Sequence, residues 1–391
     1  MLYKSAAQKN PLQCHLFSFI IALYLHFNFY GSTTVMKMTM RWYGTKFDSV
    51  TLQNIRQVPG IAGVITTLYD IPAGELWPLE RIKAIKKEVE DAGLQICGIE
   101  SVNIHDDIKI GLPSRDGYID AYIKTLEHLG QCGIDMVCYN FMPVFDWTRT
   151  DLAKKRADGS TVLAYDQKVV DSIDPEKFIE GTDKNSNGFI MPGWEPERLA
   201  HVKELFEKYK DVDNEKLFNN LVYFLKAIRP VCEKYDIKMA IHPDDPAWPV
   251  FNLPRIITGK ESILKMLHAV DAPFNGITFC TGSLGTNPQN DLPGIVRACK
   301  GRIHFAHVRN LHHYAPGVFE EAAHLSSDGS FDMYEIVKAL YETGFSGPIR
   351  PDHGRMIWGE KAMPGYGLYD RALGVAYING LWEAIEKNET H

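Results

Sequence analysis

Four apolar segments in the C-terminal half of the chain each end in a residue of a type that binds metal ions. The segments are MAIHP, ITFCTG, HFAHVRN and IRPDHG, and the residues in question are His242, Cys280, His307 and Asp352. Imidazole, thiolate and carboxylate groups together suit Mn²⁺, Fe²⁺ or Zn²⁺. A single His or Cys in an apolar run is more often an ordinary core residue. Recurrence at the same point of four consecutive units instead indicates one metal site at the ends of parallel strands.

Residues beside these candidate ligands add groups that can transfer protons or bind an anion. His353 follows Asp352 directly, and a histidine there can transfer a proton near neutral pH or orient a ligand by a hydrogen bond. Arg309 and Arg355 can each bind a carboxylate in a bidentate manner or serve as a structural ion-pair partner. Tyr366, between two glycines in PGYGLYDRALG, could bring a phenol to the same rim.

Polar and aromatic side chains follow the earlier apolar runs and could bind a polyhydroxylated molecule by hydrogen bonds. Trp42 ends the first run, Asn103 and His105 follow the third, and Asn140 ends the fourth. His312 comes just after the HVRN segment, and we place it near the substrate as well. The aspartates that follow His105 are more typical of a solvated loop.

Short apolar runs alternate with amphipathic stretches from Met38 onward, which is the rhythm of βα units. We expect eight strands, at residues 38–43, 63–69, 95–101, 136–141, 238–243, 276–282, 303–310 and 347–353. We expect eight helices, at residues 51–58, 78–92, 116–133, 215–236, 260–269, 289–299, 330–344 and 368–387. Gly93, Gly133 and Gly344 are helix stop signals. The count predicts a (β/α)8 TIM barrel, and no Gly-rich phosphate turn supports the alternative of a doubly wound open sheet.

Residues 142–214 interrupt the fourth βα unit and are rich in charge, Gly, Pro and Trp. A long segment at the catalytic end of a barrel commonly forms a lid or supplies substrate contacts. A peripheral addition or a contact between subunits is an equally good interpretation. We therefore expect one catalytic barrel domain at 38–391, with an insertion or lid at 142–214.

The composition is that of a globular enzyme. The chain has 391 residues, 45% hydrophobic and 23% charged, and a net charge of -7, which argues against broad binding to nucleic acid. The seven cysteines show no disulfide-framework spacing, so we expect reduced thiols and a cytoplasmic protein. No run after Met38 is apolar for long enough to cross a membrane.

The N-terminal segment, residues 1–37, needs a separate interpretation. Its apolar run LFSFIIALYL superficially resembles a signal-peptide core, but the run is too short to span a bilayer and no A-x-A-like cleavage site follows. Met36, Met38 and Met40 all offer later start codons. We prefer an extension outside the functional domain, or a misassigned start, over a targeting segment.

In the segments that hold the candidate ligands and substrate contacts, the chain resembles the mannonate dehydratase family of xylose-isomerase-like barrel enzymes. The resemblance begins at about Met38 and continues to the C-terminal region, and the extension before Met36 has no counterpart in the family pattern. It rests on the segments MRWYG at 40–44, GIESVNIH at 98–105, YNFMPVFDWTRTDL at 139–152, AIHPDDPAWP at 240–249, TFCTGSLG at 278–285, HFAHVRN at 304–310 and RPDHGR at 350–355.

The resemblance implies dehydration of D-mannonate to 2-dehydro-3-deoxy-D-gluconate, a step in hexuronate breakdown, with Mn²⁺ or Fe²⁺ as cofactor. It implies proton-transfer roles for His353 and Tyr366, and ligand roles for His242, Cys280, His307 and Asp352. Which of His353 and Tyr366 is base and which is acid stays open. No nucleotide-cofactor motif is present, as expected for a reaction without net redox change. We also expect a small sugar-acid substrate and a homo-oligomer, a dimer or higher.

Other functions stay open at this point. An aldose–ketose isomerase or epimerase on the same barrel commonly holds its metal with several carboxylates, whereas a cysteine and two histidines dominate here. The acidic composition disfavours a metal-dependent nuclease of related architecture. A noncatalytic sugar-acid binding protein would bind its ligand without turnover.

Overall fold

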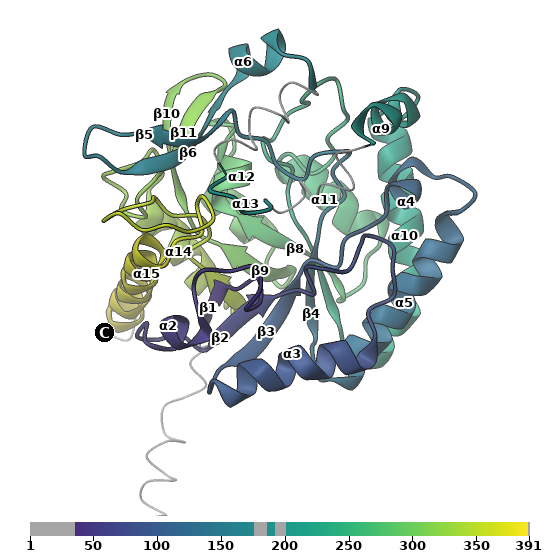
Figure 1. Ribbon diagram of the computed structural model, residues 1–391, viewed down its shortest axis with the longest axis horizontal. Coiled ribbons are helices and arrows are strands. Elements are labelled where there is room, and N and C mark those ends of the chain that lie inside the picture. The colour runs from purple at the N-terminus through teal and green to yellow at the C-terminus, as the bar shows by residue number, and fades with distance from the viewer. Residues whose placement is uncertain (1–35, 176–185, 192–200, 390–391) are drawn as a thin grey trace, which may run out of the picture. The chain divides into compact units, whose positions relative to one another are not determined.

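The computed structural model describes residues 36–175, 186–191 and 201–389. Its central strands are β1 (Lys37–Arg41), β2 (Gly63–Thr66), β3 (Gln95–Glu100), β4 (Met136–Tyr139), β7 (Lys238–Ile241), β8 (Asn275–Cys280), β9 (Ile303–His307) and β12 (Pro348–Arg350). They form a closed parallel ring in the order β1-β12-β9-β8-β7-β4-β3-β2 (Figure 1). β1 pairs with both β2 and β12, so no sheet edge remains. Closure confirms the predicted TIM barrel and excludes the open sheet.

The eight predicted helices are all present in the described part of the chain. They are α2 (Leu52–Arg56), α3 (Leu79–Asp91), α5 (Arg115–Gln131), α10 (Asn214–Tyr235), α11 (Lys260–Ala269), α13 (Leu292–Ala298), α14 (Met333–Glu342) and α15 (Leu368–Glu389). The predicted stop signals Gly93, Gly133 and Gly344 have φ angles of +75°, +71° and +74°. This left-handed conformation ends a helix at little cost only when the residue is glycine.

Helix α14 shows how the local sequence sets these elements. The side chain of Asp332 caps its first turn by accepting a hydrogen bond from the backbone nitrogen of Glu335 at 3.2 Å. Its apolar stripe is buried and consists of Met333, Ile336, Val337, Ala339 and Leu340. The spacing of three and four residues puts this stripe on one helix face, as a helix packed against other elements requires.

All eight barrel strands end before their predicted last residues, and two of them end at candidate metal ligands. The run 276–282 ends as a strand at Cys280, because the next residues form the short helix α12 (Thr281–Gly285). The run 303–310 ends as a barrel strand at His307, and β10 (Asn310–Ala315) then leaves the barrel.

A second sheet, antiparallel and four-stranded, lies outside the barrel ring (upper left in Figure 1). Its order is β10-β11-β6-β5, where β11 is Val318–Ala322, β6 is Thr161–Asp166 and β5 is Asp151–Lys155. β5 and β6 come from the predicted insertion, whereas the hairpin β10–β11 follows β9 and was not expected from the sequence. The hairpin therefore anchors part of the insertion to the barrel. The insertion also holds α6 (Gln167–Ser172) and α9 (Val202–Tyr209), and its residues 176–185 and 192–200 lie outside the described residues.

The barrel unit begins two residues before the predicted boundary at Met38. The chain divides into a unit of residues 1–35 and a unit of residues 36–391. The backbone nitrogen of Lys37 donates a hydrogen bond to the carbonyl oxygen of Gly347 at 3.1 Å, so Lys37 belongs to the barrel. Residues 1–35, which make up most of the predicted extension, lie outside the described residues.

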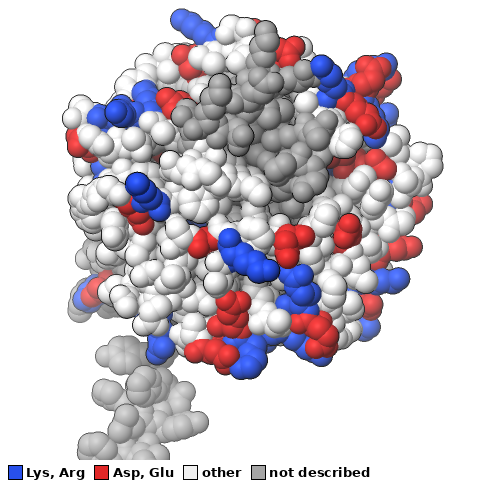
Figure 2. Space-filling view, in the orientation of Figure 1, with Lys and Arg blue, Asp and Glu red and all other residues white. Residues whose placement is uncertain are grey.

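The described surface carries both signs of charge. On the face drawn in Figure 2, Lys and Arg side chains are interspersed with Asp and Glu side chains. This is the mixed surface of an ordinary globular protein and not a single-sign field. The cysteines that the structure describes are free thiols, and no helix in the described ranges is both long and apolar enough to cross a membrane.

Candidate metal centre and active site

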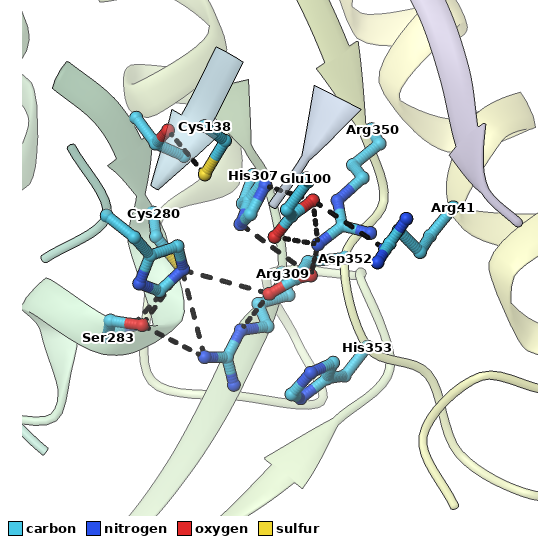
Figure 3. Close-up of polar contacts among 12 residues, drawn as sticks. Arg41, Glu100, Cys138, Cys280, Ser283, His307, Arg309, Arg350, Asp352 and His353 are labelled. Atoms are coloured by element: carbon cyan, nitrogen blue, oxygen red, sulfur yellow. Dashed lines mark hydrogen bonds and ion pairs between the residues drawn. The ribbon is translucent and has the colours of Figure 1, made fainter. Parts of the chain in front are cut away.

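The four predicted ligands meet at the carboxyl ends of β7, β8, β9 and β12. The ligand atoms of His242, Cys280 and His307 all lie within 4.8 Å of one another. Asp352 lies beside them, with Oδ2 3.8 Å from Cys280 Sγ and Oδ1 3.7 Å from His307 Nδ1 (Figure 3). In a closed parallel barrel this is the end where chemistry gathers.

His307 gives the clearest indication that the cluster fits a metal ion. Its side chain is fully buried, yet neither ring nitrogen has a hydrogen-bond partner among the described residues. The nearest carboxylates are Glu100, 3.5 Å from Nε2, and Asp352, 3.7 Å from Nδ1. Buried polar atoms are normally paired, and exceptions occur at ion sites and catalytic sites. Two imidazoles, a thiol and a carboxylate form a donor set that Mn²⁺, Fe²⁺ and Zn²⁺ accept.

Cys280 is held in the thiolate form. Burial acts to raise the pKa of its thiol, but Arg309 and the rings of His242 and His307 outweigh burial and hold that pKa well below its usual value. The backbone nitrogen and Oγ of Ser283 donate to Cys280 Sγ at 3.4 Å and 3.1 Å. The thiolate is the form of cysteine that binds metals.

Asp352 is ionised and fixed in orientation. Burial acts to raise its pKa, but the neighbouring His353, His307, Arg350 and Arg309 side chains outweigh burial and hold the pKa well below its usual value. Arg309 Nε lies 2.8 Å from Oδ2, and Arg350 Nη2 lies 2.6 Å from Oδ1. Ion pairs of this length restrict the rotation of the carboxylate and direct it toward the cluster.

The guanidinium of Arg309 forms ion pairs with carboxylates of the protein itself. Besides Asp352 it pairs with Asp245, at 2.8 Å, and with Glu321. Arg149, which is also fully buried, pairs with the same two residues, at 2.6 Å to Asp245 and 2.9 Å to Glu321. The two arginines thus belong to a buried ion-pair network behind the cluster. The geometry supports a role for Arg309 in holding the candidate ligand Asp352 better than the predicted binding of substrate.

The two residues predicted to transfer protons are in contact. His353 Nε2 lies 3.0 Å from the hydroxyl oxygen of Tyr366, and His353 Nδ1 lies 3.2 Å from Glu321 Oε1. Burial, helped by the nearby Tyr43 hydroxyl, raises the pKa of Tyr366 well above its usual value. The phenol of Tyr366 is therefore protonated at neutral pH and can act as a proton donor.

One cavity joins the cluster to this pair. Of the predicted substrate contacts, Asn103, Asn140 and Arg309 line it. Asp146 and Trp147, from the predicted insertion, also form part of its wall. The cavity therefore brings candidate ligands, proton-transfer groups and polar binding groups to one place.

Trp42 and Arg355, two other predicted substrate contacts, do not line this cavity. Trp42 packs in the barrel core, while the preceding residue, Arg41, lines the cavity. Neighbouring residues of a strand point to opposite sides, which explains the exchange. Arg355 pairs with Asp370 at 2.9 Å and with Asp158 at 3.2 Å. Its guanidinium is thus used to fix the start of α15.

His105 and His312 also lie outside the lining of this cavity. His105 caps the short helix α4 (Asp106–Ile110), where its Nδ1 accepts a hydrogen bond from the backbone nitrogen of Asp107 at 3.1 Å. It lines a neighbouring hollow that also includes Asn103 and Asn140. His312 lies on β10 in the second sheet, opposite Glu320.

Several cavity residues were not among the predicted sites. Arg41, Arg350 and Asp245 line the cavity, as does Glu100 at the end of β3. Alternation along the strand could have identified Arg350, because it lies two residues before Asp352 and so on the same side.

The fold places the chain among barrels of the xylose-isomerase-like architecture. The barrel resembles solved xylose-isomerase-like structures such as a xylose isomerase domain protein from Planctomyces limnophilus, with a TM-score of 0.52 and 12% identity over 90% of this chain and 99% of that one, which shows the fold alone. A closer relationship comes from the sequence profile of the D-mannonate dehydratase (UxuA) family, which matches residues 36–391. The chain belongs to this family, and the enzyme is a hydro-lyase.

Individual relatives agree with this assignment. The mannonate dehydratase of Brachyspira hyodysenteriae is 71% identical over 90% of this chain and 99% of its own length. That of Thermotoga petrophila is 58% identical over 90% of this chain and 98% of its own length. The crystal structure of mannonate dehydratase from Streptococcus suis superposes with a TM-score of 0.82 at 45% identity, covering 91% of this chain and 95% of that one.

Proposed function

We propose that the enzyme removes water from D-mannonate to give 2-dehydro-3-deoxy-D-gluconate and depends on one Mn²⁺ or Fe²⁺ ion. The proposed ligands are His242, Cys280, His307 and Asp352. The observation that supports the metal is the convergence of these side chains around His307, whose two buried ring nitrogens have no hydrogen-bond partner among the described residues. The substrate follows from membership of the D-mannonate dehydratase family.

Dehydration of a 2,3-dihydroxy acid requires loss of the C2 hydrogen and departure of the C3 hydroxyl. A bound divalent metal would polarise substrate oxygen and stabilise developing negative charge. Tyr366, protonated because burial raises its pKa, is suited to give its proton to the departing hydroxide. His353 Nε2, 3.0 Å from the Tyr366 hydroxyl, is suited to accept a proton. A proton can pass between the two side chains along this contact.

Arg41 is the cation that we propose to bind the substrate carboxylate. Among the described residues its guanidinium makes only a 3.4 Å hydrogen bond to the carbonyl oxygen of Ile65, a 4.0 Å contact with Glu100 and a stacking contact with Tyr43. Arg350, also in the cavity wall, already pairs with Asp352 at 2.6 Å and with Glu100 at 3.1 Å. Arg41 therefore keeps N–H donors for a bidentate contact.

Replacing Arg41 with glutamine should raise KM for D-mannonate by about 10- to 100-fold, the worth of a charge-assisted hydrogen bond, with a smaller change in kcat. Steady-state kinetics measure this. Arg355→Gln is the control, because Arg355 was a predicted carboxylate clamp but contacts Asp370 and Asp158 instead. An unchanged KM in Arg41→Gln would contradict the proposed role of Arg41. A larger rise in KM in Arg355→Gln would return the role to Arg355.

Product analysis separates dehydration from the alternative of a metal-dependent isomerase or epimerase. The expected product of D-mannonate is lighter by one water and reacts with semicarbazide as a 2-keto acid. A product of unchanged mass would contradict the proposal. Parallel assays with altronate and gluconate would define which epimeric acids the enzyme accepts.

We further propose that the insertion, residues 142–214, contributes a lid over the substrate. Asp146 and Trp147 line the cavity, which supports a role in binding. Glu204, Leu205 and Lys208 of α9 line the adjoining hollow, which shares Asn103, Asn140 and Asp146 with the cavity.

The wider setting follows from the family. We propose a step in hexuronate breakdown, in the cytoplasm, catalysed by a homo-oligomer, a dimer or higher. The free cysteines of the described residues agree with a reducing compartment.

A chain that starts at Met36 should be as active as the full chain, because residues 1–35 precede the barrel unit. A chain that starts at Trp42 is the control, because it lacks β1 and opens the ring between β2 and β12. Thermal unfolding and kcat/KM measure both. Loss of folding in the Met36 variant would make residues 1–35 part of the functional domain.

A further inference from the structure

Glu321 lies behind the proposed proton-transfer pair and is not part of the barrel. It comes from β11 in the second sheet and is fully buried. Its Oε1 lies 3.2 Å from His353 Nδ1, while the opposite ring nitrogen, Nε2, lies 3.0 Å from the Tyr366 hydroxyl. Glu321, His353 and Tyr366 thus form a continuous line of contacts that ends in the cavity.

The protons in this line follow from the chemistry of the groups. A carboxylate only accepts hydrogen bonds, so His353 Nδ1 must carry the hydrogen that it shares with Glu321. A neutral imidazole that is protonated at Nδ1 has an acceptor at Nε2. Nε2 then accepts from the Tyr366 hydroxyl, and the ring is ready to take up a proton on the side of the substrate.

We propose that Glu321 is a positioning residue of the dehydration, which fixes the ring orientation and the tautomer of His353 so that Nε2 is an acceptor in the cavity. The proposal rests on the proton-transfer role proposed for His353. It gives the second sheet a part in the reaction, because the barrel alone does not supply this carboxylate.

The surroundings of Glu321 keep it ionised and in place. Burial acts to raise its pKa, but Arg309 and Arg149 lower it to about 2. Oε1 accepts from Arg149 Nη2 at 2.9 Å and from Arg309 as well. Arg149 lies between β4 and β5, and Arg309 lies between β9 and β10, so two separate chain segments hold the carboxylate. An oxygen held in this way cannot turn away from His353 without breaking both ion pairs.

Glu320 offers a matched control on the same strand. It is buried like Glu321 and also pairs with two cations, Lys154 at 2.9 Å and Arg156 at 3.1 Å. Neighbouring strand residues point to opposite sides, so Glu320 faces away from His353. Loss of its charge tests the effect of a broken buried ion pair in the second sheet without touching the proton-transfer line.

The test compares Glu321→Gln with Glu320→Gln in the metal-loaded enzyme acting on D-mannonate. Glutamine has the shape of glutamate, but its N–H group can donate to Nδ1 and so favour the wrong tautomer. We expect kcat to fall by about 10- to 100-fold in Glu321→Gln, while metal content and KM stay within about 2-fold of the unmodified enzyme. In Glu320→Gln, kcat should stay unchanged. Unchanged kcat in Glu321→Gln, or an equal loss in Glu320→Gln, would overturn the proposal.

A double-mutant cycle with His353→Asn separates positioning from general structural support. If Glu321 acts through His353, adding Glu321→Gln to His353→Asn should lower kcat no further. If the double variant instead loses kcat by the product of the two separate factors, the proposal is overturned. Full kcat in His353→Asn alone would instead refute the proposed role of His353, which is a different result.

Glu321→Asp provides a second variant should Glu321→Gln fail to fold. It keeps the negative charge near Arg149 and Arg309 but withdraws the oxygen from His353 by one methylene length. We expect a folded enzyme with kcat reduced by about 10-fold or more. Full kcat in Glu321→Asp would overturn the proposal.

Discussion

Replacing Cys280 with serine, or His307 with alanine, is expected to remove bound metal and activity together while the barrel stays folded. Each change deletes one proposed ligand atom, and the loss acts first on metal affinity. We expect kcat/KM to fall by more than about 100-fold at limiting metal. Metal analysis of the purified protein, circular dichroism and steady-state kinetics measure the three quantities.

Cys138→Ser is the matched control for this prediction. Cys138 lies on β4, one residue before the strand ends, and is fully buried, but its Sγ contacts Thr278 Oγ1, at 3.2 Å, and not the cluster (Figure 3). This variant should keep its metal and its rate. Full metal content and full rate in both Cys280→Ser and His307→Ala would contradict the ligand assignment.

Replacing His353 with asparagine, or Tyr366 with phenylalanine, is expected to lower kcat by about 100-fold or more while metal occupancy stays near normal. His353 contacts Tyr366 through Nε2 and Glu321 through Nδ1, and neither contact involves the proposed metal. The Tyr366→Phe change removes only the hydroxyl and keeps the ring. Metal analysis measures the metal occupancy. Kinetics with saturating D-mannonate measure kcat separately from substrate binding.

Tyr369→Phe is the control, because Tyr369 is partly exposed and contacts the ring of Trp358. It should behave like the unmodified enzyme. A change confined to KM in either active-site variant would move that residue to substrate binding. Loss of metal in His353→Asn would make His353 a ligand or its essential support.

The barrel could be predicted because its pattern is local and repeated. Each apolar run of four to eight residues is followed by an amphipathic helix, and a closed ring is the architecture that eight such units commonly form. The convergence of His242, Cys280, His307 and Asp352 followed from the same regularity, since each stands at the end of a parallel strand.

The ion-pair network could not be predicted in the same way. Glu321 lies in VFEEA, where two adjacent carboxylates look like a solvated strand or turn, and its partner Arg149 is far away in the sequence. Only the tertiary fold shows that Arg149, Arg309 and Glu321 are buried together. The exchange of Trp42 for Arg41 has a simpler cause, because neighbouring residues of an extended segment point to opposite sides, and here Arg41 faces the cavity while Trp42 packs in the core.

The most direct test of the central claim is metal removal and replacement, with formation of the 2-keto acid from D-mannonate as the measurement. The chelated enzyme should be inactive, and Mn²⁺ or Fe²⁺ should restore dehydration in proportion to the metal bound, reaching full rate at one ion per chain. Full dehydration by the metal-free enzyme, or a restored activity that rearranges the sugar acid without loss of water, would contradict this account.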